Sequence, residues 1–385
     1  PNLKESRSYY IIFSLLTAAF LTFLVILNHS IQKTPLLAED GSSFEKAVVT
    51  KIIKDNIGSN GERNGEQTVE VRITSGSYKG KTVKATSLDG YLYGAVCKVG
   101  SHVIINVSAY GNTLSANVYN YDRTPVMIGF VALFLLLLFL IGGRKGIFAA
   151  VALIFAAVCI LFFYLPLMYL GVQPFLAAIL CCILITLFTL ILLGGFSIKT
   201  LSAIVGTTVG CVFAGVIAFL FGHFMHITGY NVEEVETLIL VEQNSGLQAG
   251  GILFSGILIA SLGAVMDVAM SISSAISEIY FHSPDLSMKE LVKSGIHVGR
   301  DMMGTDANTL ILAFAGGSST LMIIYYAYNM PQRQLMNSYF MGTEILQGLS
   351  GTFGIILAVP VVSVITAWLY KRKSFRHTKN DAAVL

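Results

Sequence analysis

The sequence predicts an α-helical integral membrane protein of about eight transmembrane helices, with a small extracytoplasmic β-barrel-like (OB-like) domain between helices one and two. Hydrophobic residues make up 54% of the chain and charged residues only 12%, whereas soluble proteins average about 25% charged residues. Several apolar runs exceed the roughly 18 residues that mark a membrane span. Residues 30–123 differ, because charged residues return and short β-branched runs alternate with turn signals. The lipid bilayer is therefore the expected surrounding of most of the chain.

The first apolar run covers residues 9–27, and Lys4 and Arg7 precede it. It is long for the core of a signal peptide, and the segment NHSIQKTP that follows is a poor cleavage site. We therefore expect residues 1–29 to form a retained N-terminal membrane anchor.

The second part, residues 30–123, contains five runs typical of strands, at residues 47–53, 67–76, 79–88, 102–110 and 113–122. Five short strands in this length predict a small barrel of the OB type. OB-like barrels often bind nucleic acid or sugars, but no basic patch interleaved with aromatic residues supports nucleic-acid binding here. We expect a structural or protein-contact module with an envelope protein as its partner.

Residues 124–370 form a predicted seven-helix membrane domain, and residues 371–385 form a basic tail. The expected spans are residues 125–141, 147–170, 174–194, 198–222, 250–279, 305–327 and 343–370. A polar loop at 223–248 precedes the sixth helix of the chain, and an amphipathic connector precedes the seventh. With a cytoplasmic N-terminus, nearly all lysines and arginines beside the spans lie inside, whereas the short outer loops hold Arg333. This bias favours two cytoplasmic termini and an extracytoplasmic barrel domain.

A polar stripe marks the sixth helix, where residues separated by four, three and four positions share one helical face. Upstream on roughly that face, Gly256, Ala260 and Gly263 are small residues that would let another helix approach closely. The stripe consists of Asp267, Ser271, Ser274 and Glu278.

The seventh helix begins with a second polar group, which the predicted topology places at the same end of the membrane as the stripe. Its members are Asp301, Thr305, Asp306, Asn308 and Thr309. Ionisable groups in lipid are costly, so a functional site is the default hypothesis. Asp267 would carry a proton, or Asp267, Ser271 and Asn308 would offer oxygen ligands to a cation. The competing interpretations are helix packing for the serines and headgroup contact for the acids.

Other candidates lie nearer the outer surface. Glu344 and Gln347 share a face of the last span, where neighbouring glycines either line the same path or allow close helix packing. The run at 316–320 (GGSST) would break the seventh span, as at many substrate sites, or would form a notch for helix packing.

A weak metal site, for zinc or manganese, is the remaining hypothesis for the polar loop. Its candidate ligands are His223, His226 and Glu233, and an ordinary interfacial loop is the alternative.

No enzymatic activity and no cofactor are expected, because the sequence contains no hydrolase elbow, phosphate-binding glycine loop or zinc-protease motif. A paired-aspartate protease would require the carboxylates of Asp267 and Asp306 to meet. The five cysteines show no disulfide framework and no metal-binding spacing.

The segment GAVMDVAMSISSAISEI, followed by GRDMMGTDANTLILAFAG, resembles the YibE/F-like family of bacterial membrane proteins. The resemblance covers roughly residues 125–370 and is most specific at 263–316. It implies a multi-pass protein of the bacterial plasma membrane, without a particular activity.

A weaker architectural similarity is to the RND superfamily, including SecDF-type export proteins. The similarity rests on four features: an acid in one span, a glutamate at the end of that span, an S-x-x-E connector and a following helix rich in Thr and Asn. Those proteins couple proton flow to work, and Asp267 would match their intramembrane acid. This chain departs from the pattern in its number of spans and its far smaller external domain. We therefore expect a proton- or cation-coupled transporter of a small solute, with a non-transporting envelope scaffold or export accessory as the rival.

Overall fold

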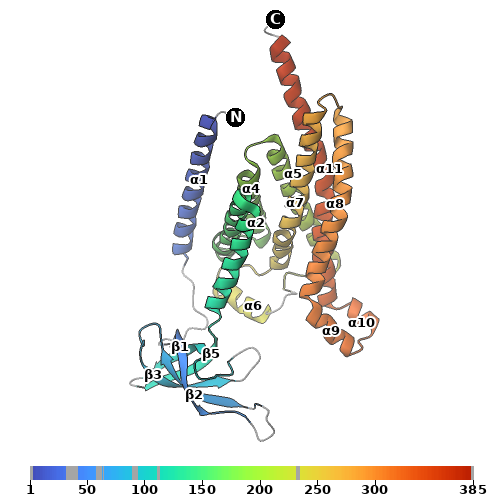
Figure 1. Ribbon diagram of the computed structural model, residues 1–385. Helices are drawn as coiled ribbons and strands as arrows, with labels where there is room; N and C mark the ends of the chain where they lie inside the picture. The colour runs from blue at the N-terminus through green and yellow to red at the C-terminus, as the bar shows by residue number, and fades with distance from the viewer. Residues whose placement is uncertain are drawn as a thin grey trace. The chain divides into compact units, whose positions relative to one another are not determined.

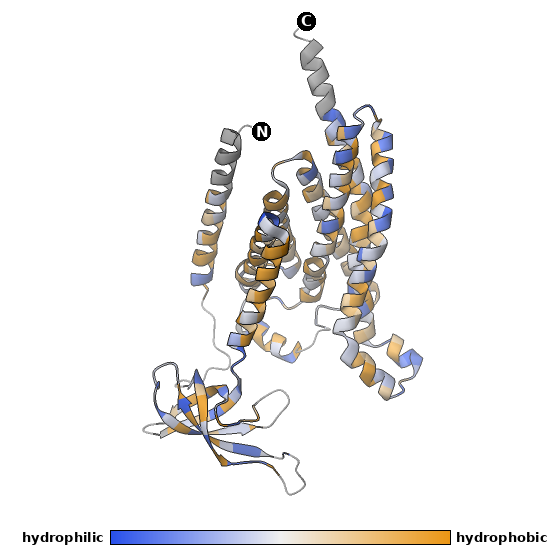
Figure 2. Ribbon diagram, in the orientation of Figure 1, coloured by the Kyte–Doolittle hydropathy of each residue, from blue (hydrophilic) through white to orange (hydrophobic). Residues whose placement is uncertain are grey.

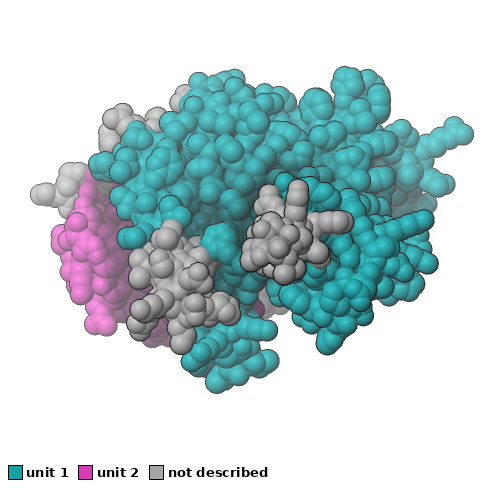
Figure 3. Space-filling model, turned by 90° about the horizontal axis from the view of Figure 1, so that it is seen from above, with its two compact units in different colours: residues 1–33, 138–385 teal, residues 34–137 magenta. Residues whose placement is uncertain are grey.

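The computed structural model describes residues 3–31, 42–57, 63, 65–88, 94–110, 113–230 and 235–382. The chain divides into two compact units, residues 34–137 and residues 1–33 together with 138–385, which Figure 3 colours separately. Within the described residues, five helices are long and apolar enough to cross a membrane, and a bent helix pair raises this to six. The chain is therefore a helical multi-pass membrane protein, as predicted.

The smaller unit contains a five-stranded closed barrel with the strand order β1-β2-β3-β5-β4. Neighbouring strands are antiparallel except β3 and β5, which are parallel. Every second side chain points inward, as pleating requires, so that Val69, Val71 and Ile73 are buried. All five predicted strands are confirmed, with the bounds β1 (Ser42–Lys54), β2 (Glu66–Ile73), β3 (Thr82–Leu88), β4 (His102–Tyr110) and β5 (Thr113–Tyr121).

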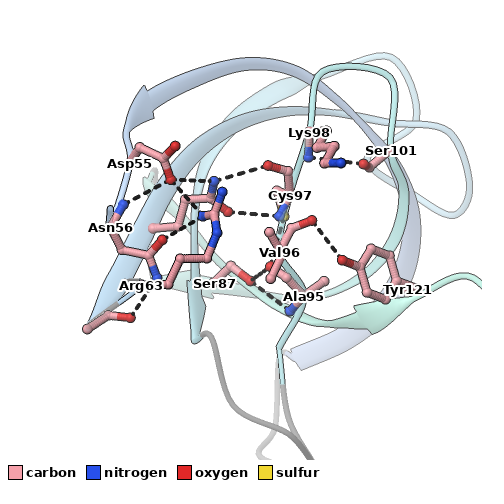
Figure 4. A network of polar contacts seen from close by, with 12 residues as sticks. Asp55, Asn56, Arg63, Ser87, Ala95, Val96, Cys97, Lys98, Ser101 and Tyr121 are labelled. Carbon is pink, nitrogen blue, oxygen red and sulfur yellow. Dashed lines mark hydrogen bonds and ion pairs between the residues drawn. The ribbon is translucent and has the colours of Figure 1, made fainter. Parts of the chain in front are cut away.

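Buried polar side chains hold the segment 94–97 against the barrel strands (Figure 4). The Gln67 side chain is only 1% exposed. Its Nε2 donates to the Cys97 carbonyl at 3.0 Å, and its Oε1 accepts from the Cys97 N–H at 2.9 Å. In the same way, the Ser87 hydroxyl donates to the Ala95 carbonyl at 2.7 Å and accepts from the Ala95 N–H at 3.0 Å. These side chains supply the hydrogen bonds that a neighbouring strand would otherwise provide.

Replacing Gln67 with alanine is expected to expose Cys97. Two buried peptide groups would lose their partners, at a cost of about 1–3 kcal/mol each. Burial raises the pKa of the Cys97 thiol, so the wild-type residue should react slowly with a maleimide. We expect Gln67→Ala to raise the labelling rate by roughly tenfold or more, measured by mass spectrometry of the Cys97 peptide. Lys98→Ala, at an exposed neighbour, is the control, and equal rates in both variants would contradict this account.

The larger unit is a bundle whose helices are mostly hydrophobic (Figure 2). Its centre is α7 (Ile252–His282), which packs against α4, α5, α8 and α11. Helices α7, α8 and α11 run side by side (Figure 1). The partners of α7 are α4 (Pro174–Gly194), α5 (Ile198–Phe224), α8 (Met288–Gly317) and α11 (Tyr339–Ala382).

Glycines bring the backbones of α5 and α11 into direct contact. A Cβ atom at Gly354 would lie 2.7 Å from the Gly210 carbonyl oxygen, and one at Gly210 would lie 2.9 Å from that of Gly354. This contact confirms the packing interpretation for Gly354. The prediction that another helix approaches closely at Gly256 and Gly263 of α7 is wrong, because a Cβ atom at either position meets nothing within 4 Å among the described residues. The close helix contacts form on other faces of the bundle.

The apolar helix after the barrel bends sharply. Within α2 (Thr124–Cys159), Gly143 has non-helical dihedral angles (φ 52°, ψ −130°). A side chain at Gly146 would collide with the Leu138 carbonyl oxygen, although eight residues of straight helix span about 12 Å. The chain therefore turns back on itself at this point. It continues through the π-helical turn η1 (Ile160–Tyr164) into α3 (Leu165–Tyr169).

Helix α1 (Leu3–His29) packs on that π-helical turn. The Asn28 side chain donates to the Phe162 carbonyl at 2.8 Å, and the Phe20 ring lies 5.8 Å from that of Phe163. The predicted anchor is thus packed against a distant part of its own unit.

Two expectations for loops and connectors need correction. The loop expected at 223–248 contains a helix, α6 (Val235–Asn244), and a further short helix, α10 (Gln332–Met336), precedes α11. The connector expected before residue 305 is the first half of α8, which begins with a Ser287–Glu290 capping box. The predicted break at 316–320 is confirmed, since α8 ends at Gly317 and α9 (Ser319–Ala327) leaves at 60°.

Candidate functional site

The stripe on α7 lies on the less buried side of the helix. Asp267, at the midpoint of α7, is exposed, as is Glu278, while Ser271 and Ser274 are half-buried. Helical periodicity explains this division, because buried residues occupy the opposite face. That face carries Val265, Ile272 and Ile276, together with the buried hydroxyls of Ser261, Ser273 and Ser277.

Helix α8 brings a second carboxylate to the level of Asp267. Gly295 packs against Ile276, and Gly299 against Ile272, so the two helices are antiparallel. Continuing this pairing places residue 304 opposite Asp267, and Asp306 is about 3 Å further along the axis. The two residues are therefore at nearly the same level on neighbouring helices, although Ile272 and Ile276, which contact α8, lie on the face of α7 opposite Asp267.

Asp306 lies on the packed side of α8, in the same helical row as Gly295, Gly299 and Leu310. Its Oδ2 atom is buried and has no hydrogen-bond partner among the described residues. Such an atom lacks the hydration that it would have in water, so binding a proton or a cation would stabilise it.

The other polar residues of α8 do not converge on this pair. Asp301, Thr305, Asn308 and Thr309 are exposed, and the Thr309 hydroxyl donates to its own helix, to the Thr305 carbonyl at 2.9 Å. Glu278 lies three turns from Asp267, near the end of α7. The structure therefore places Asp306 on the packed side of α8 at nearly the level of Asp267, and the remaining predicted residues of α7 and α8 are exposed or half-buried.

A separate cleft of about 880 Å³ lies where α7 and α11 begin and α8 ends. It contains both outer candidates, Glu344 and Gln347, together with Ser318 at the helix break. Thr343 also lines it. A single threonine next to Glu344 gives no separate signal in the sequence.

Two buried hydrogen bonds near the ends of α7 also could not be predicted from spacing. Tyr164 bonds Ser255 at 2.5 Å, and Ser277 bonds Tyr370 at 2.7 Å, hydroxyl to hydroxyl. Each pair is separated by about ninety residues in the chain, so folding alone reveals it. These contacts fix α7 against η1 at one end and α11 at the other.

The metal candidates form no group in the part of the chain that the structure covers. His223 is in the last turn of α5 and His226 follows it with φ 54°, whereas Glu233 falls outside the described residues. Across the described ranges, no three His, Cys, Asp or Glu residues are grouped so that they could hold a metal ion.

The family model described as YibE/F-like protein matches residues 130–372. The chain belongs to the YibE/F-like family. Searches of curated proteins and of solved structures find no match.

The YibE/F-like region includes α7, α8 and the part of α11 that carries Glu344, and so contains every candidate site residue named above. All five barrel strands lie before it. The family resemblance seen in the sequence is thus confirmed, and it concerns the membrane bundle.

Proposed function

We propose that this YibE/F-like protein is a proton- or cation-coupled transporter of a small solute in the bacterial plasma membrane. The observation that carries the proposal is the Oδ2 atom of Asp306, which is buried and unpartnered among the described residues and lies at nearly the level of Asp267, the midpoint of α7. Ionisable groups at this depth are costly and usually functional. A buried carboxylate oxygen without a partner favours binding of a proton or a cation, because it cannot easily remain charged and unpaired.

In this mechanism Asp267 exchanges the ion with the open polar face, and Asp306 holds it on the packed side. Ser271, Ser274, Asn308 and Thr309 supply hydrogen bonds or oxygen ligands along the path. Asp301, Thr305 and Glu278 lie on the approach to it. The mechanism contains no enzymatic step, and proteolysis of a membrane peptide that requires both aspartates would instead indicate a paired-aspartate protease.

We further infer eight spans, both termini in the cytoplasm and an extracytoplasmic OB-like barrel. The helix from Thr124 to Tyr169 has 46 residues, about twice the length that one crossing needs, and the bend at Gly143 divides it. The two halves of this helix count as two spans, the four other long helices as four and the bent pair as one. Helix α1 is the eighth. A green fluorescent protein fused to the C-terminus should fluoresce, since it folds in the cytoplasm, and a dark fusion beside an active periplasmic reporter would reverse the topology.

The test of transport is proton and cation flux into liposomes that contain purified wild-type or Asp267→Asn protein. Flux that the substitution removes supports a coupled pathway. Absence of flux with folded wild-type protein contradicts it and favours the scaffold.

The alternative, an envelope scaffold or export accessory, is supported by an exposed aromatic pair on the barrel. Phe44 is 60% exposed and Tyr119 is 47% exposed, and their rings meet edge to face at 5.3 Å. Aromatic residues are enriched in the cores of protein interfaces. Recovery of a stoichiometric envelope protein through residues 30–123, with Asp267→Asn harmless in cells, would favour this alternative.

A further inference from the structure

The cleft near Glu344 has the size of a small-molecule site. It measures about 880 Å³, within the range of roughly 300–1,000 Å³ that is usual for ligand pockets. Side chains from α7, α9 and α11 form its walls, and the break after Gly317 opens one side. The helix bends by 60° at that break.

Two of the side chains that line the cleft each have a buried polar atom without a hydrogen-bond partner among the described residues. These atoms are Oε2 of Glu344 and Oγ1 of Thr343. An unpartnered buried polar group costs about 1–3 kcal/mol, and more when it is charged. A ligand that donates hydrogen bonds and carries positive charge would therefore bind here with a favourable charge-assisted contact.

Apart from Ser318, Thr320 and Gln347, the rest of the lining is suited to an apolar body next to the Glu344 carboxylate. Tyr339 and Phe340 contribute aromatic rings, whose faces attract cations. Leu253 and Leu321 contribute aliphatic surface. None of the lining residues in the described part of the chain is basic, so no side chain there competes for Glu344. A second hollow of about 230 Å³, with Phe314 and Met341 in its wall, borders Glu344 on another side.

Size and ligand chemistry exclude a bare metal ion. The cleft has room for many water molecules at about 30 Å³ each, whereas a metal site encloses its ion closely. Glu344 also belongs to no group of three His, Cys, Asp or Glu residues within the described ranges.

We propose that this cleft binds a small organic cation, with its ammonium group on Glu344 and Thr343 and its apolar part against Tyr339, Phe340 and Leu253. The site is separate from the Asp267–Asp306 pair and does not depend on the transport proposal. In a coupled transporter, it would hold the solute.

The test is isothermal titration calorimetry of the purified full-length protein with benzylammonium and with benzyl alcohol, which match in shape but differ in charge. Benzylammonium should bind saturably, and benzyl alcohol should bind at least about tenfold more weakly. Glu344→Gln should weaken benzylammonium binding by about tenfold or more, and Thr343→Val by a smaller factor. Glu236→Gln, an exposed glutamate on α6, should leave it unchanged.

Folding and binding can be separated in the same samples. Glu344→Gln keeps the size of a half-buried side chain whose Oε2 atom lacks a partner among the described residues, so the Tm without ligand should not fall. Equal affinity for the alcohol and the ammonium, no binding to the wild type, or full binding to a folded Glu344→Gln protein would overturn the proposal. The titration needs no flux, so its failure is distinct from failure of the transporter.

The ammonium group has two natural sources, a free amine or a lipid headgroup. Repeating the titration in micelles with added phosphatidylethanolamine distinguishes them. Competition would identify the lipid as occupant, and unchanged affinity would identify a free amine.

Discussion

Asp267→Asn is expected to lower proton-coupled flux to the level of protein-free liposomes. The asparagine amide has nearly the same size as the carboxyl group but cannot take up and release a proton near neutral pH. Asp267 is exposed on the bundle surface, so the exchange should leave packing and Tm unchanged. The measurement is the initial rate of acidification inside liposomes that contain a pH-sensitive dye. Asp285→Asn, in the exposed turn between α7 and α8, should retain wild-type flux.

Substitutions of Asp306 test whether it acts together with Asp267. If the two carboxylates form one ion-binding site, Asp306→Asn alone should abolish flux, and the double variant should be no worse than either single one. Residues that act as a unit give such non-additive losses. Unaltered flux in Asp267→Asn would refute the assignment, and a residual flux that the double variant lowers further would show two separate pathways.

Gly354→Leu is expected to cause the largest loss of stability. The new side chain would meet the Gly210 carbonyl oxygen at 2.7 Å and the Ala214 methyl group at 2.9 Å from its first carbon. Overpacking of this kind costs about 1–3 kcal/mol even where side chains can shift, and here the backbone of α5 must move. We expect a fall in Tm on the order of 5–10 °C, measured by thermal unfolding in detergent.

The matched control is Gly256→Leu, because that glycine of α7 has open space around its Cβ position. Both variants lose the same flexible residue and gain the same side chain, so helix propensity cancels in the comparison. Equal Tm values for the two would show that the α5–α11 contact is not close in the membrane.

Local patterns predicted the elements best. The strands follow from β-branched alternation and turn residues, and the break after Gly317 follows from the run of two glycines and three hydroxyl residues. These features depend on neighbours in the chain. The polar stripe of α7 was also placed correctly on one face, because helical spacing is fixed.

The sequence could not predict which side chains of one helix face the neighbouring helices. The sequence grouped Asp306 with Asn308 and Thr309, yet Asp306 turns towards the bundle and the other two are exposed. The choice depends on the glycine contacts at 295 and 299, which set how α8 is rotated against α7 and α11. In the same way, the glycines of α7 and of α5 look alike in the sequence. Only the helix packed against each glycine determines whether a larger residue would fit there.

The barrel is an insertion within the chain of the membrane unit, which supplies residues before and after it. Helix α1 is packed on its own unit through Asn28, so both covalent connections of the barrel lead back to the bundle. A single proteolytic cut in either connection would leave the barrel attached.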